Sequence, residues 1–184
     1  MVAISDKRFE TIEVHEIYRG SLLSLTLEKV RIPSGRLVQR EVVRGVRSAA
    51  AVAATSSGDV VLIRQFRQPV EGEIIEIPAG LVDPREEPEQ TASRELLEET
   101  GYRAGRIAHL ADFYMTPGYS DELMSLFLAT ELSKEVAAPE ADEEIEIVLV
   151  AFDEALRMIS EGKIRDAKTI AGILLAQNEL RPAR

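Results

Sequence analysis

Apolar and polar residues alternate along the first third of the chain, and this pattern predicts strands. Ser21 to Ile32 alternates with a period of two, and Leu37 to Val43 repeats the pattern after a Pro33-Ser34-Gly35 turn. The two segments are therefore expected to pair as an antiparallel hairpin. Ser48 to Ala54 and Val60 to Phe66 form a second expected pair around a polar turn. The second of these contains a run of branched apolar residues, which suits a buried strand.

Helical signals appear further along the chain. Pro88 to Thr100 is predicted to be a helix, because proline suits a first turn and Gly101 follows as a C-cap. A last helix is expected over 166–180. Its expected face positions are Ile170, Ile173, Leu174 and Gln177. Further strands are expected at 73–77, 108–113, 124–130 and 145–152, and a further helix at 153–161. The order of elements indicates a mixed α/β (α+β) fold.

The amino-acid composition excludes several classes of protein. A chain of 184 residues suggests one domain, or one domain with an added arm. It contains no cysteine, which excludes disulfide scaffolds and thiolate zinc sites. The two histidines, His15 and His109, are too few for a histidine metal cage, and we expect both to be structural.

Charge and hydropathy suggest a cytoplasmic protein whose ligand is a small molecule. The formal net charge of -10 argues against nucleic acid as the main ligand, since a basic footprint is expected there. No apolar stretch approaches the roughly 20 residues that span a bilayer. Asp6 and Glu10 interrupt the region where a signal peptide needs an apolar core. We therefore expect neither a membrane nor a nucleic-acid partner.

Acidic residues concentrate on the helix predicted over Pro88 to Thr100. At 100° per residue, Glu95, Glu98 and Glu99 fall within one arc of about 100°. Like charges on one face repel each other, and a bound divalent cation would turn that cost into binding energy. Oxygen-only ligands favour a hard ion, Mg²⁺ or Mn²⁺. The alternative is an ordinary solvated face, which is what most glutamate-rich helices present.

The spacing of residues around this arc is that of the Nudix box. The pattern runs Gly80, five residues, Glu86, seven residues, Arg94-Glu95-Leu96, one residue, Glu98-Glu99, one residue, Gly101-Tyr102. Chance agreement is on the order of 10⁻⁸ for average residue usage. The sequence therefore resembles the Nudix hydrolases, which cleave nucleoside diphosphates linked to another moiety.

The resemblance implies an α-β-α sandwich and a set of roles. Its metal ligands would be Glu95, Glu98 and Glu99, with support from Glu86. The carbonyl of Ala79 often joins the metal shell in this family. The remaining box residue with a role is Arg94, which would orient the glutamates as their ion-pair partner.

A second segment resembles the ADP-ribose pyrophosphatases within this family. Thr116 to Glu122 begins 14 residues after Tyr102 and holds a proline near the spacing typical of that subfamily. The substrate would then contact Pro117, Gly118 and Tyr119. The alternatives are a plain Pro-Gly turn and a packing role for the tyrosine.

Other substrate contacts follow from the same resemblance. Arg67, at the end of a strand, would lie near the phosphates, and the alternative is an ordinary solvated strand end. Glu76 begins the family's lead-in to the box. The N-terminal strands commonly exchange in a dimer, so the segment from Arg40 to Arg47 is a candidate contributor from the partner chain, although strand register could equally explain its pattern. This divides the chain into a strand region over 1–45 and a Nudix domain over 46–184, and it predicts a homodimer.

The acidic loop before the last strand contains a further candidate. Glu143 matches a metal-associated position of relatives, where it binds metal or activates water. Some relatives have an acid two residues earlier, and this chain has Ala141 there. The general base could therefore be Glu143, Glu144 or a box glutamate, and each loop acid could equally be an exposed charge.

The resemblance implies Mg²⁺-dependent hydrolysis of the pyrophosphate bond of ADP-ribose to AMP and ribose 5-phosphate. Mn²⁺ is the expected substitute. One alternative is the same chemistry on another nucleoside diphosphate derivative, such as GDP-mannose, FAD or NADH. The other alternative is a sensor that binds nucleotide without cleaving it. The complete set of box glutamates favours an enzyme.

Overall fold

The protein forms two compact units in a computed structural model that describes residues 8–45, 47–137 and 144–180. The N-terminal unit comprises Met1–Val46 with Tyr114–Leu123, and the main unit comprises Arg47–Phe113 with Met124–Arg184. The segment 114–123 thus groups with the N-terminal strands. Exchange of those strands between subunits stays a prediction.

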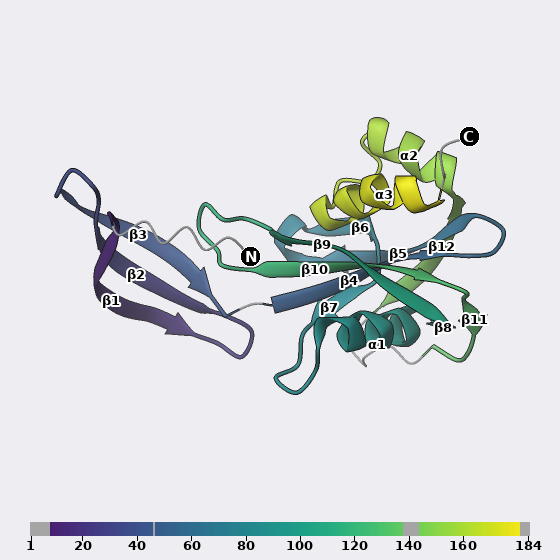
Figure 1. Cartoon of the computed structure of the whole chain (residues 1–184), viewed down its shortest axis with the longest axis horizontal. Helices are drawn as coiled ribbons and strands as arrows, with labels where there is room; N and C mark the ends of the chain where they lie inside the picture. The colour runs from purple at the N-terminus through teal and green to yellow at the C-terminus, as the bar shows by residue number, and fades with distance from the viewer. Residues whose placement is uncertain (1–7, 46, 138–143, 181–184) are drawn as a thin grey trace. The chain divides into compact units, whose positions relative to one another are not determined.

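The N-terminal unit is built on a three-stranded antiparallel sheet, ordered β1-β2-β3 (Figure 1). Its strands are β1 (Glu10–Arg19), β2 (Ser24–Arg31) and β3 (Leu37–Arg44). The predicted β2–β3 hairpin is confirmed, and Gly35 takes a left-handed φ of 80° in its turn. The sequence pattern did not delimit β1. Register shifts at Thr11/Glu13 and Glu16/Tyr18 break its alternation, which removes the local signal for a strand.

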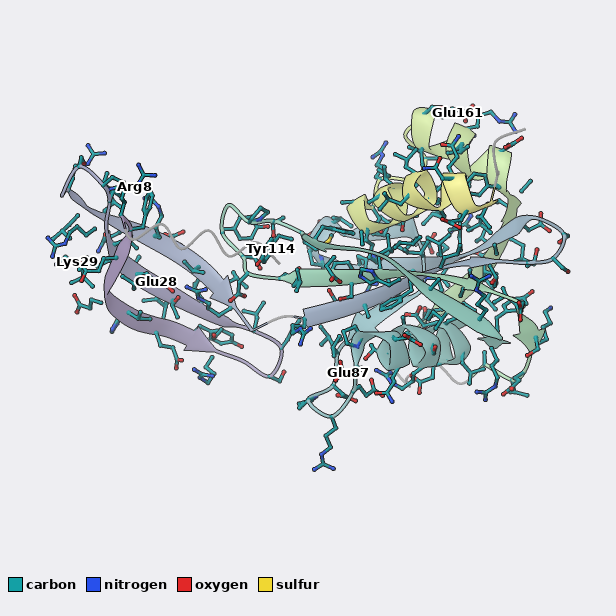
Figure 2. The ribbon with its side chains drawn as sticks, viewed as in Figure 1. Arg8, Glu28, Lys29, Glu87, Tyr114 and Glu161 are labelled. Atoms are coloured by element: carbon teal, nitrogen blue, oxygen red, sulfur yellow. The ribbon has the colours of Figure 1, made fainter. Side chains whose placement is uncertain are left out.

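Polar side chains occupy the buried positions of β2. Thr26 and Glu28 are buried, whereas Leu25 and Leu27 are only partly covered. Glu28 lies on this sheet (Figure 2) and accepts a hydrogen bond of 2.6 Å from Arg44 Nη2. Burial of this carboxylate is tolerated because the Arg44 guanidinium and the Thr26 hydroxyl both donate to its Oε1.

The main unit contains a seven-stranded sheet in the order β12-β5-β4-β10-β9. Outside this order, β6 pairs with β5 and β7 pairs with β4. The strands are β4 (Arg47–Ala54), β5 (Asp59–Arg67), β6 (Gly72–Glu76), β7 (Ala79–Leu81), β9 (Arg106–Tyr114), β10 (Leu123–Thr130) and β12 (Ile145–Ala151). A 3₁₀ turn, η1 (Gln68–Val70), joins β5 to β6, and β8 (Tyr102–Arg103) pairs with β11 (Ser133–Lys134).

Helices cover both faces of this sheet. Figure 1 shows α1 (Pro88–Thr100) on one side, and α2 (Phe152–Ser160) and α3 (Ala167–Leu180) on the other. The predicted mixed α/β fold, with a sheet between helical layers, is therefore confirmed. Among the helices of the described residues, none has the length and apolar character needed to cross a bilayer.

The ends of α1 lie where the sequence predicts them. Before the first turn, Glu87 N–H donates to the side chain of Gln90 at 2.9 Å, and Pro88 has no N–H that needs a partner. After the last turn, Gly101 takes a left-handed φ of 68° and its N–H donates to Leu97. A Cβ at Gly101 would lie 2.8 Å from the Glu135 carbonyl, so the chain crosses closely here.

The buried face of α1 packs on small residues of β4. Ala92 and Leu96 are fully buried against Ala49, Ala51 and Ala53. Alanines bring helix and sheet backbones close together, because they add little side-chain volume between them. This contact fixes the rotation of α1 and so determines where its glutamates point.

The face predicted for α3 was wrong in part. The buried residues include Thr169, Gly172, Ile173 and Ala176, whereas Leu174 is 49% exposed. A Cβ on Gly172 would lie 2.8 Å from Val52 of β4. The helix therefore packs with its small residues and Ile173, and of the large apolar side chains used in the prediction Leu174 lies off the buried face.

Candidate active site

The three box glutamates of α1 differ in their surroundings. Glu99 is only 3% exposed, Glu95 is mostly covered, and Glu98 is partly exposed. Burial of Glu99 beside the sheet requires a partner, because a desolvated carboxylate is costly. One partner is the backbone of Ala79, whose N–H donates to Glu99 Oε2 at 3.2 Å.

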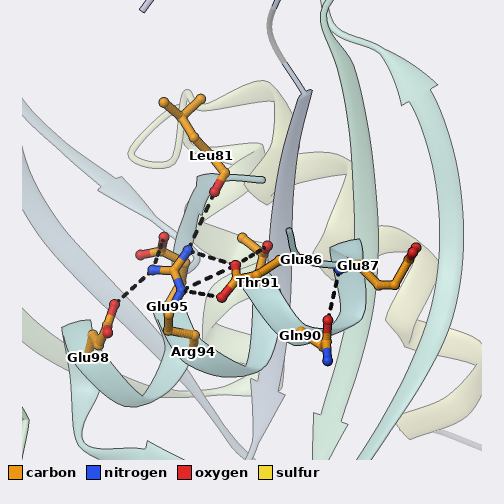
Figure 3. A network of polar contacts seen from close by, with 8 residues as sticks. All are labelled: Leu81, Glu86, Glu87, Gln90, Thr91, Arg94, Glu95 and Glu98. Atoms are coloured by element: carbon orange, nitrogen blue, oxygen red, sulfur yellow. Dashed lines mark hydrogen bonds and ion pairs between the residues drawn. The ribbon is translucent and has the colours of Figure 1, made fainter. Parts of the chain in front are cut away.

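Arg94 lies among the acids and joins them (Figure 3). Its Nη1 donates to Glu95 Oε1 at 2.8 Å and to Glu98 Oε2 at 2.9 Å. Its Nε donates to Glu86 at 3.1 Å, and Nη2 reaches the same carboxylate at 3.2 Å. The predicted orienting role thus has a geometric basis, since one planar guanidinium holds three carboxylates in fixed directions.

The network also shifts the pKa values of its members. Hydrogen bonds to Glu86 raise the pKa of Arg94, against an opposing effect of burial. The same hydrogen bonds from Arg94, together with a hydrogen bond of 2.7 Å from the Thr91 hydroxyl, lower the pKa of Glu86. The loop glutamate is therefore ionised at neutral pH and stays attached to the helix by ionic and hydroxyl contacts. No role was predicted for Thr91. The only sequence signal for its contact with Glu86 is that it lies five residues later in the chain.

Gly80 leaves the space that Glu95 occupies. A Cβ at this position would lie 1.9 Å from Glu95 Oε1 and 2.1 Å from its Cδ. The box therefore requires glycine here for close approach, and its backbone φ is not in the left-handed region. Ala79 and Gly80 lie on β7, paired with Ala50 and Ala49 of β4, so the sheet fixes the backbone against which the glutamates pack.

Replacing Gly80 by alanine is expected to displace the Glu95 carboxylate without unfolding the protein. The clash is with the end of a flexible side chain, so the chain folds while the acid face is rearranged. We expect divalent-ion binding to weaken about tenfold, the order seen when groups that orient metal ligands are altered. Mn²⁺ titration measures this. Gly72→Ala is the control, because its Cβ would meet only Val70 O at 3.7 Å; equal affinities in the two variants would contradict the explanation.

Arg67 and Glu76, two predicted substrate contacts, are bound to each other. Arg67 Nε donates to Glu76 Oε1 at 2.7 Å and Nη2 donates to Oε2 at 3.1 Å. Glu76 is 1% exposed, and burial alone would raise its pKa. Pairing with Arg67 and Lys168 lowers that pKa instead, so the carboxylate is charged. Burial would lower the pKa of Arg67, but its hydrogen bonds to Glu76, with smaller Coulombic contributions from Glu76 and Glu99, raise it.

The remaining predicted substrate residues lie together in the N-terminal unit. Arg40, Pro117, Gly118 and Tyr119 line one cavity of about 430 Å³. The segment is held on β3, because Val43 N–H donates to the Tyr119 carbonyl at 2.8 Å and Asp121 N–H donates to Val43 at 3.2 Å. The Tyr119 side chain is 58% exposed, which does not support the alternative of a packing role.

The predicted loop acid, Glu143, lies outside the described residues, and Glu144 is exposed before β12. Across 8–45, 47–137 and 144–180, no three acidic or histidine side chains converge as a ready metal cluster. Instead, Glu95 and Glu98 share Arg94, and Glu99 accepts from the Ala79 N–H. Their donor set is entirely oxygen, which fits a hard divalent cation, and the opening at Gly80 gives Glu95 room beside Ala79.

Comparison with known proteins agrees with this arrangement. Residues 45–172 match the NUDIX domain family. The chain is 39% identical over 170 residues to an ADP-ribose pyrophosphatase of Bacillus subtilis (strain 168), covering 91% of this chain and 92% of the relative. It is 38% identical over 175 residues to a methanol dehydrogenase activator of Bacillus methanolicus, covering 93% and 95%. The crystal structure of an ADP compounds hydrolase superposes with a TM-score of 0.86 at 21% identity, over 95% of each chain.

The fold and the box together define a hydrolase of pyrophosphate bonds. The chain belongs to the Nudix family, whose hydrolases generally use divalent metal ions. The resemblance inferred from residue spacing is thereby confirmed.

Proposed function

We propose that this protein hydrolyses ADP-ribose with Mg²⁺ to AMP and ribose 5-phosphate. The observation that carries the proposal is the acid face of α1, where Arg94 and Ala79 fix the box glutamates. Similarity to an ADP-ribose pyrophosphatase over 91% of the chain supports the choice of substrate. In the reaction, water adds its oxygen to one phosphorus, and the bridging oxygen leaves with the other phosphate.

The metal ligands in this proposal are Glu95, Glu98, Glu99 and the Ala79 carbonyl, with Glu143 as a further ligand. Oxygen donors suit Mg²⁺, and Mn²⁺ would substitute because it accepts the same donors. Bound divalent ions would neutralise phosphate charge and lower the pKa of the attacking water. The net acidity of the chain is then compatible with an anionic substrate.

The protein side chains would perform three tasks. Arg94 orients Glu95 and Glu98 through one nitrogen, and so limits the directions in which they bind. A carboxylate within hydrogen-bond reach of the water accepts its proton, and the candidates are the box glutamates Glu98 and Glu99 and the loop acids Glu143 and Glu144. Arg67, held by Glu76, supplies positive charge for the phosphates.

The cavity of the N-terminal unit would hold the base and ribose of the substrate. Tyr119 offers an exposed ring for stacking, and Arg40 offers a cation that lines the same cavity. We propose that this unit acts within a homodimer through exchanged strands. Apolar side chains left exposed along β1 support that assembly: Ile12, Val14, Ile17 and Tyr18. The proposed ligand is a small nucleotide rather than nucleic acid, and the proposed compartment is the cytoplasm.

A panel of substrates tests the proposed specificity. Rates with ADP-ribose, GDP-mannose, FAD and NADH are compared at saturating Mg²⁺, with nucleotide binding measured in parallel. Fastest cleavage of ADP-ribose supports the proposal. Faster cleavage of another compound would support the pyrophosphatase chemistry but contradict the choice of ADP-ribose as the substrate. Binding without any cleavage would favour a nucleotide sensor.

Pro117→Ala is expected to change the order of substrates in this panel while leaving Mg²⁺ dependence unchanged. Pro117 lines the cavity in the N-terminal unit, and altered apolar contact there is worth on the order of tenfold in discrimination. Pro33→Ala serves as the matched control, because that proline lies exposed in the β2–β3 turn. An unchanged ranking in Pro117→Ala would refute the role of this segment in specificity.

A further inference from the structure

The first turn of α3 contacts the strand end that leads into the box. Ile77 N–H donates to Thr169 Oγ1 at 2.8 Å, across 92 residues of sequence. Thr169 is fully buried. The same hydroxyl donates to Asp166 Oδ2 at 2.5 Å, and the Thr169 N–H donates to that oxygen at 2.9 Å. The Thr169 hydroxyl therefore links the start of α3 to the backbone of Ile77.

Lys168 makes a second contact with the same strand end. Its ammonium bonds to Glu76 and lies 3.1 Å from Asp166 Oδ2. The side chains of Lys168 and Glu76 are almost completely covered. A buried ammonium is costly unless it is paired, and here two carboxylates surround it. Glu76 is consequently fixed from both sides, by Arg67 of β5 and by Lys168 of α3.

Successive backbone groups after Glu76 are tied to different elements. The N–H of Ile77 is bound by α3, and the Pro78 carbonyl accepts from Ala51 of β4 at 3.0 Å. The N–H of Ala79 is bound by Glu99 of α1 at 3.2 Å. A shift of this segment at Ile77 would move both the Ala79 carbonyl and the partner of Glu99, because only Pro78 separates Ile77 from Ala79 in the chain.

We propose that Lys168 and Thr169 are positioning residues that set the Ala79 carbonyl and the Glu99 carboxylate for the divalent ion. This inference rests on the metal site of the proposed function. Neither residue touches the reacting atoms in this account. They act through Glu76 and Ile77, and their effect is on the affinity of the metal site.

The test is Mn²⁺ binding, followed by the electron paramagnetic resonance signal of the free ion, in the full-length protein without substrate. Thr169→Val keeps the shape of the side chain and removes the hydroxyl, and we expect about tenfold weaker binding. Thr169→Ser restores the hydroxyl and is expected to bind nearly as the wild type does. For the ammonium, Lys168→Met is expected to weaken binding similarly, and Lys168→Arg to recover part of it.

Ile173→Val is the control for lost packing, because it removes a buried methyl group from the same helix and no polar contact. Melting temperatures of all variants identify any that do not fold. Wild-type Mn²⁺ affinity in folded Thr169→Val would overturn the inference, as would equal weakening in Ile173→Val or in Thr169→Ser. Wild-type protein that binds no Mn²⁺ would overturn the proposed metal site itself, and the inference with it.

Discussion

Glu99→Gln is expected to lose turnover by about 10²–10³-fold while still binding ADP-ribose. The two side chains have nearly the same shape, so the buried position of Glu99 tolerates the change. The substitution removes one negative charge and one oxygen donor from the face that holds the metal. The expected magnitude is that of removing one preorganised electrostatic group from an active site.

Steady-state rates at saturating Mg²⁺ and equilibrium binding of substrate measure the two halves of this prediction. Glu89→Gln is the matched control, since it makes the same change at an exposed acid in the first turn of the same helix. Its rate is expected to equal that of the wild type. Wild-type turnover in Glu99→Gln at saturating Mg²⁺ would remove Glu99 from the ligand set.

Arg94→Lys is expected to reduce kcat/KM by about 10–100-fold, although the positive charge is kept. Arg94 contacts Glu95 and Glu98 from Nη1 and Glu86 from Nε, and a single ammonium lacks this fixed fork. The range is typical for changes to residues that orient metal ligands. The carboxylates would remain neutralised in part but would sample more directions.

The control for Arg94→Lys is Arg103→Lys, at an exposed arginine paired with Glu135 on the surface. Surface pairs contribute little, so its kinetics are expected to stay at the wild-type level. Mg²⁺ titration of the rate should show a higher half-saturation concentration for Arg94→Lys. Full activity in Arg94→Lys would mean that the positive charge of Arg94, and not its hydrogen-bond geometry, accounts for its contribution to activity.

The parts of the fold that follow from local signals are the parts that the sequence predicted well. The bounds of α1 were predicted from Pro88 and Gly101, whose effects are confined to one helical turn. The shared face of Glu95, Glu98 and Glu99 follows from helical geometry, and their contacts with Arg94 and Ala79 agree with it.

Other features depend on contacts between distant segments, and the sequence did not reveal them. The pairing of Glu76 with Lys168 spans 92 residues, and no local pattern marks either member. The buried face of α3 was misjudged at Leu174, because small residues of this helix pack against β4. In β1, bulges removed the alternation on which strand prediction depends.

The most direct test of the central claim is to identify the products formed from ADP-ribose by the wild-type protein. The reaction is run with Mg²⁺, with EDTA, and with Mg²⁺ restored in excess after EDTA, and the products are separated by chromatography. Our account predicts AMP and ribose 5-phosphate in equal amounts, their disappearance with EDTA, and their return with Mg²⁺. Products from cleavage of another bond, such as ADP or free adenine, or hydrolysis that persists in EDTA, would contradict it.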